Sequence, residues 1–388
     1  MNAPYELLVG RDDVVAYLAG AGLLGRVAAS PAEVRVDEVT AGNMNRVFIA
    51  RGPLGSLAVK QAPPWVQVVG PEWPVDPGRI ASEARTYGLL AERVPESIPV
   101  IVAFDPERYV LVMEDLSALD VLRDALVRQV VSGADAVGID YAQLGEVVGR
   151  FVGELAASTS VSALGPAAHA ELVELAANPE LCRMTLDVVL DEPYRQHEHN
   201  HWHPALDERV AALYVDERMR GAVASIRHDF ETRHEALIHG DLHSGSVMIG
   251  RPAGAQRVVV FDPEFSFVGP IGMDLGLFWA NLELAAIAAD AVGQPALAAA
   301  RRSAIDTSWD AFAEVWDAAG ASAPSPSLAA ISRDAWRFAG VEGMRRAVGF
   351  SHAADIESLP GDVLGEASIR LFDAARHHVL TGEALPAS

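Results

Sequence analysis

Cysteine and basic residues are scarce in this sequence. Its single cysteine, Cys182, excludes an intrachain disulfide framework and fits a reducing compartment, so we expect a cytoplasmic protein. The 30 Lys and Arg residues stand against 53 Asp and Glu residues, which gives a formal charge of −23. Because nucleic-acid binding requires a footprint of Lys and Arg, the composition argues against a nucleic-acid partner.

The sequence also lacks a long uninterrupted apolar run. Its first residues, MNAPYELLVG, contain no basic region followed by an apolar core, so we expect no secretory signal. The most apolar region, residues 276–300, is interrupted by Asn281, Glu283, Asp290 and Gln294. A transmembrane helix needs about 20 predominantly apolar residues. We therefore expect no membrane partner and interpret this region as a pair of core helices.

The patterns that are present predict two lobes. Half of the 388 residues are hydrophobic and 21% are charged, as in an ordinary globular protein. Strands are predicted within residues 34–59, 99–104 and 109–113, and helices at 5–28 and 79–91. Helical patterns then dominate at residues 121–131, 141–158, 169–175, 207–228, 283–320 and 328–351. The sequence thus predicts an α+β protein with a small β-rich N-terminal lobe and a larger helical C-terminal lobe.

The chain is organised around two acidic turns within residues 237–264. The first turn, HGDLH, carries Asp241, and the second, DPE, carries Asp262 and Glu264. In protein kinases an Asp accepts the hydroxyl proton, while an Asn five residues later and a downstream Asp hold magnesium. Asp241 and Asp262 fit these two Asp roles; Ser246 stands at the Asn position as a weaker ligand, and Glu264 could supply the missing oxygen. The alternative is a pair of ordinary turns flanking a hairpin.

Features suited to binding nucleotide phosphates precede this stretch. The small residues around Gly42 would let the backbone approach phosphate, and Asn43 or Asn45 could donate side-chain hydrogen bonds. Lys60, at the end of a strand, would neutralise the α- and β-phosphates, and Glu83 is placed to pair with it. Taken alone, the same residues are also compatible with a β-turn and a surface lysine.

Two further segments complete the predicted N-terminal lobe. The segment Pro63–Pro77 is rich in proline, so we expect neither helix nor regular sheet there. Its Trp73 could either cap a ligand or pin the segment to the lobe. Glu114, Asp115 and Leu116 follow the last strand and mark the expected crossing between the lobes, where backbone groups would face an adenine edge.

Three features of the C-terminal lobe have competing interpretations. Asp274 is interpreted as a buried carboxylate that accepts bonds from loop amides, in preference to a metal ligand. The adjacent Arg345 and Arg346 should point about 100° apart on a helix, which predicts one exposed arginine and one with an acidic or ligand partner. The alternating histidines between His197 and His203 have spacing compatible with a transition metal, but we interpret the segment as a plain surface loop.

Together these motifs resemble the methylthioribose kinases, members of the kinase-like superfamily that includes aminoglycoside and choline phosphotransferases. The similarity extends over roughly residues 39–356 and is carried by the following segments: GNMNRVF, VKQAPPWVQVVGPEWP, VMEDLS, NPELCRMTLDVVLDEPY, HGDLHSGS, DPEFSFVGP and MRRAVGFSHAADIE. The HGD motif is shared by many small-molecule phosphotransferases. The DPE motif, the tryptophan-proline segment and NPELCR are more specific.

The resemblance implies a two-lobed protein-kinase-like fold, divided into residues 1–113, a hinge at 114–116, and residues 117–388. It implies transfer of the ATP γ-phosphate to O1 of 5-methylthioribose in methionine salvage, with Asp241 as the base. It further implies ATP binding by Asn45, Lys60 and the hinge, and Mg²⁺ binding by Asp262 and Glu264. Arg345 and Arg346 would contact the sugar, and a homodimer is implied.

Three departures from the family pattern affect the expected substrate more than the expected reaction. Thr40-Ala41 replaces the usual Gly-Asp before Gly42, and HSGS replaces HTGS. Residues 119–129 lack the usual segment of basic residues and glycine. The alternative substrates are therefore a related 5-modified pentose such as 5-deoxyribose, or an aminoglycoside. A nucleotide-binding scaffold without activity is the non-enzymatic alternative.

Overall fold

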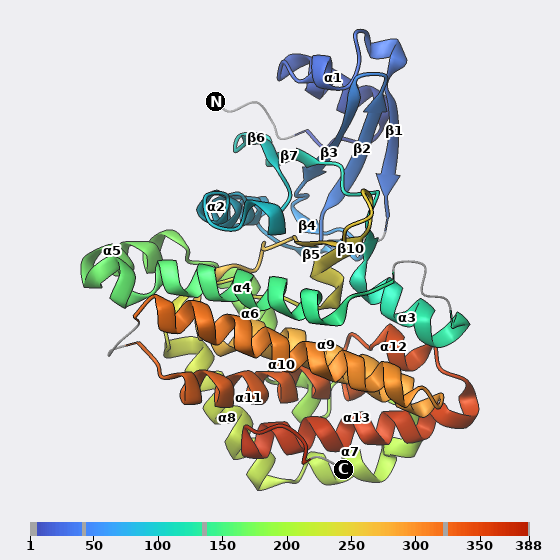
Figure 1. The fold of residues 1–388 in the computed structure, drawn as a ribbon, viewed down its shortest axis with the longest axis vertical. Helices are drawn as coiled ribbons and strands as arrows, with labels where there is room; N and C mark the ends of the chain where they lie inside the picture. Colours follow the sequence, from blue (N-terminus) through green and yellow to red (C-terminus); the bar gives the residue numbers. More distant parts are fainter. Residues whose placement is uncertain (1–5, 41–43, 134–137, 321–324, 387–388) are drawn as a thin grey trace. The chain divides into compact units, whose positions relative to one another are not determined.

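The computed structural model describes residues 6–40, 44–133, 138–320 and 325–386. The chain divides into two compact units, Met1–Ala118 and Leu119–Ser388, and each has its own hydrophobic core (Figure 1). The first unit is built on a β-sheet, and the second is mainly helical. This confirms the expected α+β class. The finer division at residues 113 and 117 stays a prediction.

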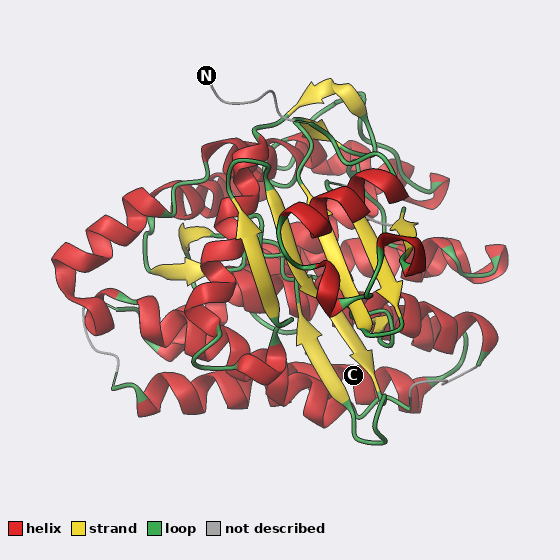
Figure 2. Ribbon diagram, turned by 90° about the horizontal axis from the view of Figure 1, so that it is seen from above, coloured by secondary structure: helices red, strands yellow, loops and turns green. Residues whose placement is uncertain are grey.

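A five-stranded antiparallel sheet forms the centre of the first unit, and its strands lie side by side in Figure 2. In spatial order the strands are β1 (Arg35–Val39), β2 (Arg46–Gly52), β3 (Gly55–Gln61), β7 (Val110–Glu114) and β6 (Ile101–Asp105). Buried side chains of β2, β3 and β7 pack against helix α1 (Arg11–Gly20), with Leu18, Phe48 and Val59 at most 1% exposed. Helix α2 (Ile80–Leu90) lies where the sequence predicts it.

Two expectations for the first unit are wrong in detail. The helix predicted at 5–28 is shorter: α1 ends at Gly20, and a 3₁₀ turn follows at Leu24–Arg26. The segment Pro63–Pro77 does contain regular sheet, because β4 (Trp65–Val66) pairs with β5 (Gly70–Pro74) as a short antiparallel hairpin. Proline is tolerated there because a two-stranded hairpin has only edge strands, which can leave backbone positions unpaired.

Within the residues that the structure describes, the second unit contains the α-helices α3 to α13, numbered in chain order. Their bounds are α3 (Leu122–Ser132), α4 (Tyr141–Thr159), α5 (Val161–Leu175), α6 (Pro179–Val188), α7 (Asp207–Leu213), α8 (Glu217–Thr232), α9 (Gly272–Ala291), α10 (Pro295–Ala318), α11 (Leu328–Val348) and α13 (Gly361–Thr381). Helix α12 spans Ala354–Glu357. None of the helices within the described ranges has the length and apolar character that a bilayer-spanning helix requires.

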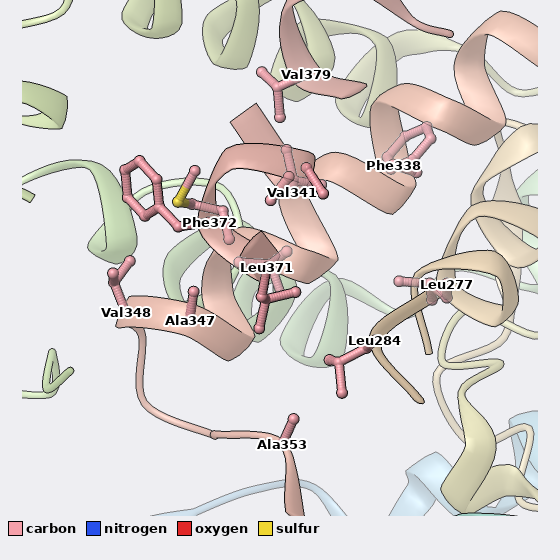
Figure 3. Packing of buried hydrophobic residues seen from close by; sticks show 14 of the residues in the cluster. Leu277, Leu284, Phe338, Val341, Ala347, Val348, Ala353, Leu371, Phe372 and Val379 are labelled. Carbon is pink, nitrogen blue, oxygen red and sulfur yellow. The ribbon is translucent and has the colours of Figure 1, made fainter. Parts of the chain in front are cut away.

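Helix α9 is the centre of this unit. Almost all of its residues are buried, because α4, α10, α11 and α13 pack around it. A helix that is apolar on all sides is expected in such a central position. The interpretation of residues 276–300 as core helices is confirmed for α9, whereas only Ala298 is buried in the part of α10 that falls in this range, residues 295–300. Figure 3 shows part of the packing: Leu277 of α9, Phe338 and Val341 of α11, and Leu371 of α13 belong to one cluster.

Two small sheets position the acidic turns. β9 (Ala236–Ile238) pairs with β12 (Phe267–Gly269), so the chain segments before the first turn and after the second turn are joined. β10 (Val247–Gly250) pairs with β11 (Arg257–Val260) and with β8 (Asp120–Val121). The hairpin of β10 and β11 therefore connects the two turns, and both turns are anchored to sheet at each end.

Candidate active site

The turn that carries Asp241 is held by buried groups. Gly240 has a φ of 82°, and a Cβ at this position would lie 2.3 Å from the carbonyl oxygen of Phe265, so only glycine fits without a rearrangement. The fully buried carboxylate of Asp274 accepts the backbone N–H groups of His239 and Gly240, at 2.7 and 2.9 Å. Burial raises the pKa of Asp274. The interpretation of Asp274 as an acceptor for loop amides is confirmed.

The buried His239 connects the two acidic turns. Its Nδ1 accepts the N–H of Asp241 at 3.3 Å, so the other ring nitrogen, Nε2, carries the proton and donates to the carbonyl oxygen of Phe261 at 3.0 Å. Phe261 immediately precedes Asp262. The imidazole ring of His239 thus connects the first acidic turn with Phe261, the residue before the second acidic turn.

Asp241 lies in a positively charged environment. Its side chain is 31% exposed, and its Oδ2 lies 3.4 Å from Nε2 of His243. The Nδ1 of His243 accepts the N–H of Gly245 at 2.8 Å, so Nε2, which faces Asp241, carries a proton that it can donate. Desolvation raises the pKa of Asp241, but His243, Arg345 and Arg346 outweigh it and lower this pKa below the usual value. The carboxylate is therefore ionised at neutral pH.

Arg345 and Arg346 share one buried partner. The Glu342 carboxylate accepts Nε–H of Arg345 at 2.6 Å and Nε–H of Arg346 at 2.8 Å. Desolvation raises the pKa of Glu342, but the two guanidinium groups outweigh it and lower this pKa to about 2. The prediction that one arginine is exposed is wrong: the two side chains are only 13% and 12% exposed. Residues three and four positions apart face the same side of a helix, so both arginines reach Glu342.

A cavity of about 80 Å³ opens beside Asp241 within the second unit. Asp241, Gly240, Glu342 and Arg345 contribute its polar groups, and the rest of its lining is mostly apolar. The apolar residues are Met184, Val188, Val189, Leu190, Phe265, Met273, Leu277, Phe338 and Val341. Arg346 is not part of this lining. A ligand in the cavity would thus meet an ionised carboxylate and a guanidinium group within a lining that is otherwise mostly hydrocarbon.

The second acidic turn is fixed mainly through its backbone. Asn178, just before α6, donates from Nδ2 to the carbonyl oxygens of Glu264 and Ser266, at 2.8 and 3.3 Å. Glu264 is 2% exposed, and Asp262 has a φ of 68°, a region that non-glycine residues rarely adopt. Such backbone strain is common at ligand sites. Ser246 donates its hydroxyl to the carbonyl oxygen of Asp241 at 2.8 Å, so it stabilises the first turn.

Within the first unit, Lys60 and Glu83 form a buried ion pair. Nζ of Lys60 lies 2.6 Å from the Glu83 carboxylate, and their side chains are 6% and 1% exposed. Asn45 is buried as well, and its Oδ1 accepts Nη2–H of the buried Arg79 at 3.0 Å. Arg79 also donates to the carbonyl oxygens of Met44 and Pro63, at 2.8 Å each, so it holds the chain at Met44 and Asn45 against the start of α2.

The remaining site residues predicted in the first unit are the nucleotide residues Asn43, Glu114, Asp115 and Leu116 and the substrate residue Trp73. Glu114 ends β7 opposite Leu57, and Asp115 lies 3.3 Å from Arg51. Desolvation raises the pKa of Asp115, but Ser117, Ser56 and Arg51 outweigh it and lower this pKa. The other residues lie as follows: Leu116 is buried, Trp73 is half-buried on β5, and Asn43 falls outside the described residues.

Several residues that position this site were not predicted. Glu342 stands three and four residues before the two arginines, a spacing that itself signals shared helix contacts. Asn178 lies within the NPELCR segment, but nothing in that sequence indicates that it bonds to the second acidic turn. The ring contacts of His239 and His243 depend on how the chain folds after β9. Apart from its position before a predicted helix, nothing in the sequence indicated that Arg79 positions this site.

Comparison with known proteins places these features in a family. Residues 36–315 match the phosphotransferase enzyme family. The chain is 34% identical to a methylthioribose kinase of Geobacillus kaustophilus, with 83% of this chain and 80% of the relative covered. It is also 34% identical to a methylthioribose kinase of an Enterobacter species, with 91% and 88% covered. An ethanolamine kinase structure from Plasmodium vivax has a TM-score of 0.46 at 9% identity, with 96% of each chain covered, a similarity too weak to support a conclusion.

Proposed function

Because this chain belongs to the phosphotransferase enzyme family, and within it to the methylthioribose kinases, we propose that it transfers the γ-phosphate of ATP to O1 of 5-methylthioribose. The observation that best supports this proposal is the cavity beside Asp241. Its polar groups offer an ionised carboxylate and Arg345 to the hydroxyl groups of a sugar. Its apolar residues offer hydrocarbon contacts to a methylthio group, whose burial is favourable by roughly 0.8 kcal/mol per carbon.

Asp241 has the role of the base in this proposal. A carboxylate with a lowered pKa is a weak general base, so the main contribution of Asp241 is to orient the anomeric hydroxyl group. Asp241 accepts the hydroxyl proton only as the bond to phosphorus forms. Phosphoryl transfer depends mostly on positioning and on stabilising charge. Asp274, Gly240 and His239 fix the position of the Asp241 backbone and thereby supply the first of these requirements.

The assignment of ATP and Mg²⁺ is part of the same proposal. Lys60, paired with Glu83, would contact the α- and β-phosphates, and Asn45 and the segment Glu114–Leu116 would contact the nucleotide. Asp262 and Glu264 would hold Mg²⁺, which takes one or two carboxylates together with phosphate oxygens. This donor set fits the ion, and bound Mg²⁺ would offset the charge of the phosphate groups. Ser246 is a weaker candidate ligand, because its hydroxyl already bonds to Asp241.

A substrate panel tests the proposal. ADP release should be measured with 5-methylthioribose, 5-deoxyribose, ribose and kanamycin at matched concentrations. We expect 5-methylthioribose to have the highest kcat/KM, with ribose lower by about 10- to 200-fold because it lacks the apolar substituent. A higher kcat/KM for kanamycin would overturn the sugar assignment. ATP binding without turnover of any of the four would favour the scaffold interpretation.

The implied homodimer is a separate proposal. Its support is the resemblance to the family alone, and the proposed catalytic groups do not depend on it. Light scattering coupled to size-exclusion chromatography would distinguish a particle of about twice the chain mass of 41.3 kDa from a monomer.

A further inference from the structure

The histidine loop, defined here as residues 195–204, brings two imidazole rings close to a buried carboxylate. It follows the 3₁₀ turn η5 (Glu192–Tyr194) and contains His197, His199, His201 and His203. Sequence patterns favour a plain surface loop. In the structure the rings of His197 and His199 instead turn toward the carboxylate of Glu192, and their centroids lie 4.5 Å apart at an interplanar angle of 75°.

The three side chains present ligand atoms at nearly the spacing that a metal ion requires. Nδ1 of His199 lies 2.9 Å from Oε2 of Glu192, and Nδ1 of His197 lies 3.6 Å from the same oxygen. All three ligand atoms lie within 4.8 Å of one another. Bonds of about 2.0–2.1 Å in a tetrahedral zinc site place the ligand atoms about 3.3 Å apart. The two distances from imidazole nitrogen to carboxylate oxygen would therefore change by only a few tenths of an ångström on coordination, and the two imidazole nitrogens already lie within 4.8 Å of each other.

The protonation pattern is compatible with metal binding. Nδ1 of His197 accepts the N–H of His199 at 3.3 Å, so this nitrogen carries a lone pair in the metal-free protein. Nδ1 of His199 donates to Glu192, and the proton on this nitrogen would be released when an ion binds. An ion could replace these two hydrogen bonds with two Nδ1 bonds and one carboxylate bond.

The cluster combines a fixed carboxylate with accessible imidazoles. The Glu192 side chain is 8% exposed, whereas those of His197 and His199 are 20% and 32% exposed. Asn200 donates from Nδ2 to the carbonyl oxygens of Glu192 and Arg195, at 2.7 and 2.9 Å, and this closes the loop around the cluster. Less reorganisation is needed on binding when ligand positions are fixed beforehand.

We propose that Glu192, His197 and His199 form a binding site for a transition-metal ion of the Zn²⁺ class. Two imidazoles and one carboxylate suit zinc, copper, nickel or iron, whereas magnesium and calcium favour oxygen ligands. The site is thus chemically distinct from Asp262 and Glu264. Three protein ligands leave the fourth tetrahedral position for water. This inference does not depend on the proposed kinase activity.

The ion would link the histidine loop to the helix that carries the paired arginines. The ring of His199 contacts that of Phe350, just after α11, with centroids 5.2 Å apart. A Cβ on Gly349 would lie 3.3 Å from Cγ of Pro193 in η5, so the proline ring packs closely against the backbone of Gly349. Tyr194 is partly buried, and desolvation together with Glu342 raises the pKa of its hydroxyl group. A metal ion on Glu192 would therefore stabilise the region that backs Glu342 and its arginines.

A second cluster supplies an internal comparison. His201, His352 and Glu357 also place ligand atoms within 4.8 Å. However, both ring nitrogens of His352 already contact protein oxygens, at 2.7 Å to the carbonyl of His201 and 3.0 Å to Glu357, and the Glu357 side chain is 57% exposed. An ion there would have to displace stronger contacts and would gain a less fixed carboxylate, so this cluster is the weaker candidate.

Metal titration of the full chain tests the proposal. The protein is first treated with a chelator, and Zn²⁺ binding is measured by calorimetry; Co²⁺ is then added as a spectroscopic probe. We expect one equivalent of Zn²⁺, a Co²⁺ absorption spectrum of tetrahedral type, and a higher unfolding temperature with Zn²⁺ than without. The variants are His197→Ala, His199→Ala and the double variant, with His203→Ala as the matched control in the same loop and His352→Ala as the control for the second cluster.

The expected outcomes separate the two clusters. Each single variant should weaken Zn²⁺ binding by about 100-fold or more, the double variant should abolish it, and the two control variants should bind as the unmodified chain does. Circular dichroism in chelator checks that the variants fold. The proposal is overturned if the unmodified chain binds no Zn²⁺, if the double variant keeps its equivalent, or if His352→Ala removes it.

Discussion

Each unit of the molecule contains one buried ion cluster among its proposed site residues, and the two clusters are built differently. In the first unit, one ammonium group meets one carboxylate, in the pair Lys60–Glu83. In the second, the guanidinium groups of Arg345 and Arg346 meet the single carboxylate of Glu342. The first pair is balanced in charge by itself. The second is balanced only when the nearby Asp241 is counted, which explains why the arginines lower the pKa of Asp241.

The difference shows that buried ion clusters can serve two purposes. A balanced pair fixes the direction of its lysine, and the fields of its two charges largely cancel at longer distances. An unbalanced cluster keeps a net positive field, which acts on whatever lies in the adjacent cavity. We therefore expect changes at Asp241 and Glu342 to have larger consequences than changes at the balanced pair. The following predictions test this expectation.

The largest effect should follow removal of the carboxylate that completes the unbalanced cluster. Asp241→Ala should lower kcat by about 10²- to 10⁴-fold, because the hydroxyl group loses both its orienting partner and its proton acceptor. Nucleotide binding, measured by calorimetry, should change little. Asp187→Ala on α6, which removes only an exposed ion pair with Arg183, is the control. An unchanged rate in Asp241→Ala would remove Asp241 from the role of base.

Removing the shared carboxylate should destabilise the protein more than removing the carboxylate of the balanced pair. Glu342→Gln leaves two buried guanidinium groups, which cannot lose their protons, and should cost about 3–5 kcal/mol. Glu83→Gln leaves one lysine, which can become neutral, and should cost less. Thermal unfolding of both variants measures the difference. Equal losses would show that the charge balance of the two clusters is irrelevant to stability.

The acid limb of the stability curve should carry the signature of Glu342. Its folded-state pKa of about 2 lies below the ordinary value of 4.5, so its stabilising contribution is complete above about pH 4.5. The contribution is lost as the pH falls toward 2, and it amounts to about 3 kcal/mol. Glu342→Gln should therefore lose less stability than the unmodified chain between pH 4.5 and 2, as measured by denaturant unfolding. Parallel curves for the two proteins would contradict the lowered pKa.

The smallest expected effect separates the two arginines. Arg345 lines the cavity beside Asp241, whereas Arg346 bonds to Ser351 at 3.1 Å and lines a different cavity with His352. Arg345→Ala should raise the KM for the sugar by about 10- to 100-fold, the loss expected for hydrogen bonds to a charged group. Arg346→Ala should raise it less, and neither variant should weaken ATP binding as strongly. The reverse order would exclude Arg345 from sugar binding.

Local patterns allowed much of the architecture to be predicted. Residues of α2, α4 and α11 have helical periodicity in the sequence, and Asp274 lies where loop amides need an acceptor. The contacts of His239 and Asn178 were not predictable, because they join segments 22 and 86 residues apart. The arrangement of the histidine loop was not predicted either, because it depends on side-chain contacts of the buried Glu192 and on bonds from Asn200.

The hairpin of β4 and β5 was missed for a different reason. Prolines normally argue against sheet. In the segment Pro63–Pro77 the prolines therefore counted for more in our prediction than the few strand-forming residues did. A hairpin with strands of two and five residues needs few ladder bonds and tolerates proline at its edges. Rules derived from longer strands therefore fail for such short elements.

The imidazole of His239 has a consequence for thermal fluctuations. Its two ring nitrogens are bonded to the turn of Asp241 and to the carbonyl group before Asp262. The width of an aromatic ring is set by covalent bonds, so vibration can change the gap between these backbones only by stretching two hydrogen bonds. Even when outer loops move, the relative placement of the two acidic backbones should vary far less than flexible side chains would allow.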